Sequence, residues 1–398
     1  MTPTKPLGQM EFTVLMASLS ALVALAIDAM LPALKDIGAE LGAAGNDVQL
    51  IVTFVFIGSA MGQLVSGTLS DVIGRRPAII AFIGVFTLGT LLCIASTDFD
   101  TMLAGRILQG FGAAGPQVVG LAMIRDTHSG DRMARISSFV MSIFIMVPIV
   151  APLMGQGVLL FFGWRAIFTA FLIYAGIILI WFYFRQRETL PRERREAFAW
   201  RSFARNLRVV LTTRVLIVHA LVYALLLSVL IAYLSSALQI FQEGYGVGEA
   251  FPIYFAILAA GIGVASLMNG ALVLRFGMRR LAMLAVGMIA LVSAAFLVFA
   301  AAYDGLPPFW AMMAYFAVVL FCFGGAVGNI PALALEPLGE RAGMGSTLFG
   351  GLGTLIAVPI GGFVGQSFDG TLTPILLGFA VLPGVALVVM WVAGGQRG

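Results

Sequence analysis

The sequence predicts an all-α integral membrane protein with twelve transmembrane helices in two pseudo-symmetric six-helix bundles. Hydrophobic residues make up 60% of the 398 residues and charged residues only 11%, whereas about 25% charged residues is usual in soluble domains. The apolar residues fall into runs of about twenty, a length that crosses a bilayer as a helix. A charged turn at 67–77 recurs in weaker form at 270–280, which indicates two related halves.

Each expected helix is one of these apolar runs. In chain order they occupy residues 10–34, 48–70, 78–97, 101–124, 136–160, 164–184, 215–239, 251–274, 281–301, 308–333, 343–367 and 371–394. An even number of spans places both termini on the same side of the membrane. Nearly all arginines fall on that side, and only Lys35 and Arg165 fall on the other. The positive-inside rule therefore predicts cytoplasmic termini, and we expect a bacterial inner membrane.

One long polar connection separates the sixth run from the seventh. Residues 185–214 contain nine arginines and three glutamates, and they divide the chain into an N-terminal bundle (1–184), a cytoplasmic linker (185–214) and a C-terminal bundle (215–398). Apolar side chains alternate with arginines around Trp200. This pattern favours an amphipathic helix on the inner leaflet, although a simple tether would also suffice.

The composition argues against several kinds of site. The chain has only two histidines, and its two cysteines lie inside apolar runs. These residues are too few for a multi-histidine metal or haem site. No phosphate-binding Gly-x-x-x-x-Gly-Lys-Ser/Thr motif occurs, and no nucleophile and base are clustered as in a hydrolase. We therefore expect no enzyme, no cofactor and no nucleic-acid partner. The expected form is a monomer in the lipid bilayer that binds a small amphipathic molecule.

Asp28 and Arg106 are the strongest candidates for chemistry because they are ionisable residues inside apolar runs. Counting from the outer surface places both about 8 Å deep. A nearby arginine favours the ionised form of a carboxylate, whereas dehydration favours the protonated form. A carboxylate that alternates between these two environments can couple a proton to a cargo. The alternatives are an interfacial carboxylate for Asp28 and a tie to backbone carbonyls for Arg106. Glu11, Glu336 and His219 are weaker candidates.

The turn at 67–77 joins the second and third runs. Gly67 and Gly74 permit a tight reversal, and the Arg75–Arg76 pair resists translocation across the membrane. Asp71 lies among these positive charges.

The fifth run contains Pro148, Pro152 and Gly155 in a charge-free span. Prolines bend a membrane helix, and glycine permits close approach of another backbone. Flexible helices of this kind suit a protein that rocks about a central site.

Polar or aromatic residues within other spans are possible cargo contacts, although each alone is more often a packing residue. A cavity lined by aromatic side chains and a few polar groups favours amphipathic, drug-sized molecules. The candidates are Gln63, Gln109, Phe144, Tyr233, Gln239, Asn269, Asn329 and Phe349.

With these residues in view, the chain resembles the major facilitator superfamily over nearly its whole length. The turn at 67–77 matches the loop signature of that family, and residues 106–112 match its fourth-helix signature. More narrowly, residues 28–34, 125–132 and 334–343 resemble the Bcr/CflA group of drug:proton antiporters.

The resemblance implies a role for each matching residue. Asp28 would be the protonatable carboxylate and Arg106 its partner, with protons as the coupling ion. Asp71, Arg75 and Arg76 would form a cytoplasmic latch that stabilises the outward-open state. Two departures from the family pattern stand out. Ala151 and Gln156 occupy positions where glycine is usual, and Leu274 and Met278 replace charged residues in the second-half turn, which predicts a weaker second latch.

The expected function is export of drug-like molecules, such as bicyclomycin or chloramphenicol-type compounds, by drug/proton antiport with alternating access. A metabolite transporter of the same fold, working as a symporter, is the alternative. A passive channel is a further alternative, and it predicts flux that neither saturates nor depends on a proton gradient.

Overall fold

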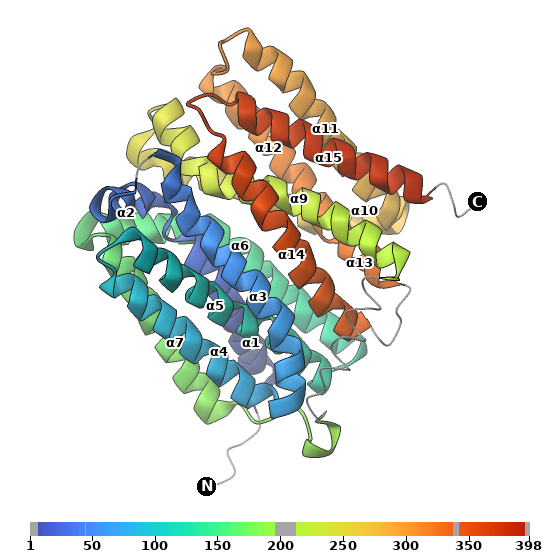
Figure 1. Cartoon of the computed structure of the whole chain (residues 1–398). Helices are drawn as coiled ribbons and strands as arrows, with labels where there is room; N and C mark the ends of the chain where they lie inside the picture. Colours follow the sequence, from blue (N-terminus) through green and yellow to red (C-terminus); the bar gives the residue numbers. More distant parts are fainter. Residues whose placement is uncertain (1–6, 44, 196–211, 337–341, 395–398) are drawn as a thin grey trace. The chain divides into compact units, whose positions relative to one another are not determined.

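The computed structural model describes residues 7–43, 45–195, 212–336 and 342–394 (Figure 1). Nearly all of these residues are helical, and no β-strand occurs among them. Within the same ranges, twelve segments are long and apolar enough to cross a membrane. The predicted all-α fold with twelve spans is therefore confirmed.

The chain divides into two compact units. Unit 1 comprises Met1–Ala43 and Phe54–Asn206, and unit 2 comprises Ala44–Thr53 and Leu207–Gly398. The predicted division into 1–184, 185–214 and 215–398 stays a prediction. The amphipathic segment expected around Trp200 lies outside the described residues.

Up to residue 195, the described part of the chain contains seven helices and three short helical segments. The helices are α1 (Gln9–Asp28), α2 (Leu34–Leu41), α3 (Leu50–Ile73), α4 (Arg75–Ala95), α5 (Phe99–Thr127), α6 (Gly130–Phe162) and α7 (Trp164–Arg185). The short segments are η1 (Leu31–Ala33), η2 (Gly45–Gln49) and η3 (Arg192–Arg194). The segment η2 and the first residues of α3 group with unit 2.

The other helices that the structure describes belong to unit 2. They are α9 (Arg214–Gln239), η4 (Ile240–Gly244), η5 (Gly248–Ala250), α10 (Phe251–Phe276), α11 (Met278–Ala301), α12 (Phe309–Val327), α13 (Asn329–Leu335), α14 (Ala342–Gln366) and α15 (Thr373–Gly394). The tenth span consists of two helices, α12 and α13, because the chain is interrupted at Gly328.

Small residues let the helices of unit 1 approach closely. Helices α4 and α5 pack along their length, and a side chain at Gly89 or Gly112 would overlap backbone atoms of the facing helix. Close backbone approach through small residues is the usual basis of helix association in membranes, where burial of apolar surface gives little advantage. Helix α1 is buried on most sides, which places Asp28 inside the bundle.

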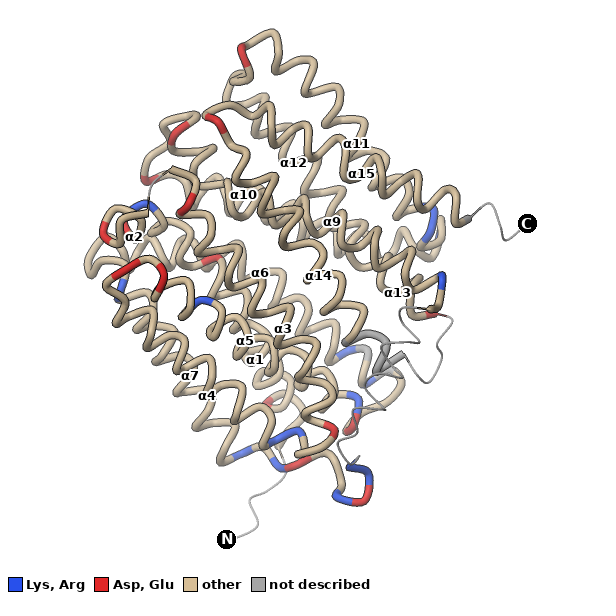
Figure 2. The backbone as a smooth tube through the Cα atoms, viewed as in Figure 1, with Lys and Arg blue, Asp and Glu red and all other residues tan. Residues whose placement is uncertain are grey.

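The charged residues are separated from the apolar middle of each unit. Figure 2 shows Lys, Arg, Asp and Glu gathered mainly at helix ends, with long uncharged stretches between them. Helix α4 has 21 residues, which corresponds to about 30 Å, the thickness of the hydrocarbon core. Arg75 begins this helix, and beyond its other end Arg165 donates to the carbonyls of Ile94 and Ser96 at 3.0 and 2.8 Å. Charged contacts therefore bracket one membrane thickness in unit 1.

Most expected helix edges lie within three residues of those in the structure, but two differ by six. The first run was expected to end at residue 34, whereas α1 ends at Asp28 and the apolar segment continues through η1 and α2 to Leu41. Pro32 lies in η1, at the break between the two α-helices. The fifth helix begins at Gly130, six residues before its expected start.

Candidate functional site

Asp28 is the last residue of α1 and is buried, with only 3% of its surface exposed. Among the residues that the structure describes, no hydrogen bond or ion pair to its carboxylate is formed. A buried carboxylate without a fixed counter-ion is costly and can change its protonation state when its surroundings change. A proton-binding role for Asp28 stays a prediction.

Arg106 approaches α1 directly before Asp28. It lies in α5 with no exposed surface, and its Nη2 donates to the carbonyl of Ala26 at 2.9 Å. Its Nη1 donates to Oε1 of Gln109, whose Nε2 donates to Thr90 Oγ1 on α4 at 2.9 Å. The guanidinium thus connects α1 to a polar chain within α4 and α5. The backbone tie considered as an alternative role for Arg106 is present.

The ring of Phe168 completes the surroundings of Arg106. This ring, from α7, lies 5.7 Å from the guanidinium carbon and is fully buried. A cation over a desolvated aromatic face is stabilised by the ring quadrupole. Four helices of unit 1 therefore converge on the buried arginine.

Gly155 brings α6 against the same end of α1. A Cβ atom at this position would overlap the carbonyl oxygen of Ala29, the residue after Asp28. Pro148 and Pro152 both lie inside α6, and Pro152 is buried. Of these three residues of α6, Gly155 is in direct contact with the residue that follows Asp28.

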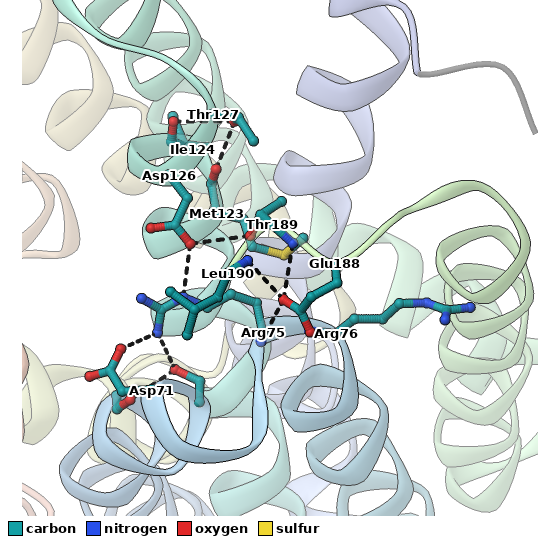
Figure 3. Close-up of polar contacts among 12 residues, drawn as sticks. Asp71, Arg75, Arg76, Met123, Ile124, Asp126, Thr127, Glu188, Thr189 and Leu190 are labelled. Atoms are coloured by element: carbon teal, nitrogen blue, oxygen red, sulfur yellow. Dashed lines mark hydrogen bonds and ion pairs between the residues drawn. The ribbon is translucent and has the colours of Figure 1, made fainter. Parts of the chain in front are cut away.

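The turn between α3 and α4 forms a second polar site, which we call the Arg75 cluster (Figure 3). Arg75 donates to Asp71 at 2.5 Å, to Ser70 Oγ at 2.7 Å and, through Nε, to Asp126 at 3.0 Å. Ser70 in turn donates to the carbonyl of Gly67 at 2.8 Å. The guanidinium is mostly buried and has two carboxylate partners, so the turn is held by charge-assisted hydrogen bonds.

Glu188 closes the same cluster from the segment after α7. Its carboxylate accepts from the backbone N–H groups of Arg75 and Arg76 at 2.9 and 3.2 Å, and from those of Thr189 and Leu190 at 3.0 Å. The first amides of α4 have no partner within the helix, and a carboxylate there also interacts favourably with the helix dipole. Glu188 therefore caps α4 from more than one hundred residues away.

Two further contacts fix the start of the polar connection. Thr189 donates to Asp126 at 3.1 Å, and Arg76 donates to the carbonyl of Tyr183 at 2.6 Å while lying 5.0 Å from its ring. The backbone at Gly74 has φ of +101°, and a side chain there would also overlap the Glu188 carboxylate. Glycine is therefore required at this position by both conformation and space.

Asp126 and Glu188 are site residues that the sequence pattern does not reveal. Asp126 entered only within a stretch that resembles a family, and Glu188 only as one charge in the linker. The available signal was a lone acidic residue next to arginines at the end of an apolar run, a pattern that occurs at many helix ends.

The possible cargo contacts lie in both units and form separate small groups. In unit 1, Gln109 belongs to the Arg106 chain, Gln63 donates to Ser59 Oγ at 3.3 Å, and Phe144 is partly buried. In unit 2, Phe349 lies 5.4 Å from the ring of Tyr223.

The other candidates in unit 2 are also engaged. Tyr233 packs between Phe255 and Phe316. Asn269 and Asn329 exchange amide hydrogen bonds at 3.0 and 2.8 Å. Gln239 accepts from Gln49 and donates to Asn46 Oδ1 at 2.9 Å. Their role in cargo binding stays a prediction.

The weaker proton candidates have different surroundings. Glu11 accepts two hydrogen bonds of 2.7 Å from Arg185 and one of 3.2 Å from Trp181. Nδ1 of His219 lies 2.8 Å from the carbonyl of Val215. Glu336 is exposed after the end of α13.

The second-half turn, between α10 and α11, has the same backbone form but other partners. Gly277 has φ of +81°, and Arg275, Arg279 and Arg280 surround it. All ion pairs found among the described residues lie in unit 1. Among the residues that the structure describes, these three side chains make one hydrogen bond, a long one of 3.4 Å from Arg279 to the carbonyl of Met390.

Comparisons of sequence agree with the predicted resemblance. A model of the Major Facilitator Superfamily matches residues 16–351. The uncharacterized MFS-type transporter YdgK of Bacillus subtilis is 30% identical over 356 residues, which cover 88% of this chain and 87% of YdgK. The bicyclomycin resistance protein homolog of Haemophilus influenzae is 27% identical over 368 residues, 92% of this chain and 91% of that protein. The multidrug resistance protein MdtL of Escherichia coli O9:H4 is 28% identical over 386 residues, 93% and 92% of the two chains.

Solved structures show the same fold. The human organic anion transporter MFSD10 (TETRAN) aligns with a TM-score of 0.69 and 16% identity, over 97% of this chain and 99% of that structure. The xylose transporter XylE from E. coli, in a partially occluded inward open conformation, aligns with a TM-score of 0.73 and 13% identity, over 96% and 98%. With a family model that spans most of its length and relatives that are transporters, this integral membrane protein belongs to the Major Facilitator Superfamily and is a transporter, not an enzyme.

Proposed function

We propose that this transporter exports small amphipathic, drug-like molecules in exchange for protons, with Asp28 as the proton-binding group. The observation that carries the proposal is the burial of Asp28 without a fixed partner among the described residues. A structural carboxylate in such a place would be expected to have an ion pair, as Asp71 and Asp126 do. The names of the resistance-protein relatives support a drug-like cargo.

The surroundings of Asp28 suggest how proton binding is coupled to cargo. Arg106 holds the backbone of α1 at Ala26, and Gly155 lets α6 touch the next turn at Ala29. Protonation removes a buried charge at the end of α1. Because α5 and α6 both contact this end, a change in its packing would move them as well. A cargo that binds only one protonation form of Asp28 would then exchange with the proton.

The Arg75 cluster would serve as the conformational latch of this cycle. Its contacts fix the α3–α4 turn to α5 and to the segment after α7. Replacing Asp71 by Asn would remove one charge partner of Arg75 and should slow turnover while leaving the cargo site in place. A transport rate equal to that of the wild type would contradict this role.

The charge distribution supports a location and an orientation in the membrane. We propose insertion in a bacterial inner membrane with both termini in the cytoplasm, because arginines concentrate at the ends expected to face that side. The functional form would be a monomer that needs no cofactor other than protons. Reporter fusions at either terminus that become active only in the periplasm would contradict this orientation.

The test is proton movement in sealed proteoliposomes with an imposed pH gradient. Chloramphenicol and a panel of lipophilic cations are added to the wild type, to Asp28→Asn and to a control, Asp36→Asn, which removes an exposed carboxylate from α2. We expect substrate-triggered proton release in the wild type and the control, and its loss in Asp28→Asn. Retained binding of the cargo to Asp28→Asn would show that the variant is folded.

The other outcomes distinguish the alternatives. Proton-coupled flux in Asp28→Asn equal to that of the wild type would remove Asp28 from the mechanism. Proton uptake together with cargo would indicate symport. Flux that does not saturate and does not respond to the gradient would indicate a channel. No response to the whole panel from folded protein would favour a metabolite as cargo.

A further inference from the structure

The turn between α10 and α11 combines positive charge with a lack of acidic residues. Arg275, Arg279 and Arg280 are all exposed, and no ion pair to any of them occurs in the described part of the chain. The sequence contains no Asp or Glu between Glu249 and Asp304. Three guanidinium groups within six residues therefore have no carboxylate on their own two helices to neutralise them.

The apolar side chains beside these arginines are exposed as well. Leu274 is 90% exposed and Phe276 is 43% exposed, and the guanidinium of Arg275 lies 5.3 Å from the Phe276 ring. Helix α10 ends and α11 begins at this turn, and both are membrane spans. The arginines therefore lie where an apolar, lipid-facing surface meets the polar interface.

The end of α15 contributes to the same place. Arg279 donates to the carbonyl of Met390, and Trp391 beside it is 70% exposed. Trp residues are enriched at the level of lipid headgroups because the ring is amphipathic. This contact associates the α10–α11 turn with a neighbouring helix that also has an interfacial side chain.

The first amides of α11 add further donors. Among the described residues, no side chain accepts a hydrogen bond from the first amides of α11, whereas Glu188 does so at the start of α4. The open N-terminus of a helix favours an anion such as phosphate. Here it occurs together with the three arginines, so both the charge and the hydrogen-bond donors point to an anionic group.

The adjoining apolar surface decides which anion fits. A free phosphate ester would gain nothing from Leu274, Phe276 and Trp391, whereas a phospholipid can place its acyl chains against them and its phosphate among the arginines. We propose that this turn is a binding site for the headgroup of an anionic phospholipid, such as phosphatidylglycerol. The site is independent of the proton-coupling proposal, because it depends on neither Asp28 nor the cargo.

Lipid binding to the purified full-length protein tests the site. Native mass spectrometry counts bound phosphatidylglycerol and phosphatidylcholine during titration, and thermal unfolding in mixed micelles reports stabilisation by each lipid. The test variant is R275Q/R279Q/R280Q. The control, R132Q/R135Q/R192Q, removes three exposed arginines from unit 1 and so matches it in charge and exposure.

We expect the wild type and the control to prefer phosphatidylglycerol. The test variant should lose this preference, with affinity for phosphatidylglycerol lower by about tenfold or more, since each arginine near an anionic lipid contributes appreciably. Leu274→Asp provides a second variant that keeps all three arginines, and it should also weaken binding by adding a competing carboxylate.

Three results would overturn the proposal. The first is an unchanged preference for phosphatidylglycerol in the test variant and in Leu274→Asp. The second is an equal loss in the control, which would mean that total charge matters and not this turn. The third is equally tight binding of water-soluble glycerophosphoglycerol, which would make the site one for free phosphate esters.

Discussion

The two glycine turns of this transporter have the same backbone form and opposite charge environments. Gly74 and Gly277 have φ of +101° and +81°, each joins two membrane spans, and each is followed by arginines. In unit 1 those charges meet Asp71, Asp126 and Glu188, whereas no carboxylate pairs with the arginines beside Gly277 in the described chain. A repeated turn therefore preserves its conformation through glycine, while residues distant in sequence determine what its charges do.

The largest expected effect comes from removing the buried guanidinium of the first turn. Arg75→Gln leaves Asp71 and Asp126 close together without their shared cation, which should lower the free energy of unfolding by about 3 kcal/mol. Arg279→Gln in the second turn should change it by less than about 0.5 kcal/mol, because an exposed side chain with one long hydrogen bond contributes little. Denaturant titration in mixed micelles measures both variants. Equal losses would show that the two turns do not differ in stability.

A smaller effect is expected from the cap of α4. Glu188→Gln removes the charge that faces several backbone amides and should destabilise unit 1 by about 1–2 kcal/mol. The matched control is Glu193→Gln, which changes an exposed glutamate five residues further along. Thermal unfolding compares the two variants, and protease sensitivity near residue 190 should rise only in the first. A neutral Glu188→Gln would mean that Asp71 and Asp126 alone hold the turn.

Transfer of the Asp71–Arg75 pair to the second turn tests whether a local ion pair alone stabilises such a turn. Leu274→Asp together with Met278→Arg gives the second turn the same charged pair as Asp71 and Arg75 at the same spacing. We expect a gain below about 0.5 kcal/mol, because an exposed i,i+4 pair is screened and the equivalents of Asp126 and Glu188 are missing. The measurement is the unfolding midpoint at low and high salt. A gain of several kcal/mol would show that the local pair, and not the distant partners, stabilises the first turn.

The smallest effect concerns Asp98, an exposed carboxylate that caps α5. The backbone N–H of Thr101, together with its hydroxyl, holds the pKa of Asp98 below its ordinary value. A lowered pKa means that the ionised cap stabilises the fold above the ordinary pKa, near 3.9, and that this contribution is lost as the pH falls through the folded-state pKa.

The test for Asp98 uses the difference in unfolding midpoint between variants. Asp98→Ala should lower the midpoint at pH 7, and Asp98→Asn should retain most of the cap because Asn is also a good N-cap residue. The difference between the wild type and Asp98→Asn should shrink as the pH falls below about 4. A difference that is independent of pH would exclude a charged cap.

Hydropathy predicted the fold because the bilayer permits few solutions. All twelve spans were expected from apolar length alone, and only their edges moved, as where η1 and α2 extend the first span to Leu41. The sequence predicted only part of the Arg75 cluster. Asp71 lies four residues from Arg75 and is visible in the local pattern, but Asp126 and Glu188 are brought to it by tertiary packing.

The surroundings of Asp28 show the same limit. Burial of the carboxylate followed from its place in an apolar run, and Gly155 was expected to permit close backbone approach. Gly155 packs against the carbonyl of Ala29 because of the way α6 crosses α1. No local sequence pattern specifies that crossing.

The contact between Gly155 and Ala29 also limits how this protein can evolve. It joins a backbone carbon to a backbone carbonyl, so no side-chain change at position 29 can make room for a residue larger than glycine at 155. Second-site mutations that restore transport to Gly155→Ala should therefore arise at residues that change the direction of α6, such as Pro148 or Pro152. They should not arise at the contact itself. Among related transporters, this glycine should vary only together with the bend of the helix that contains it.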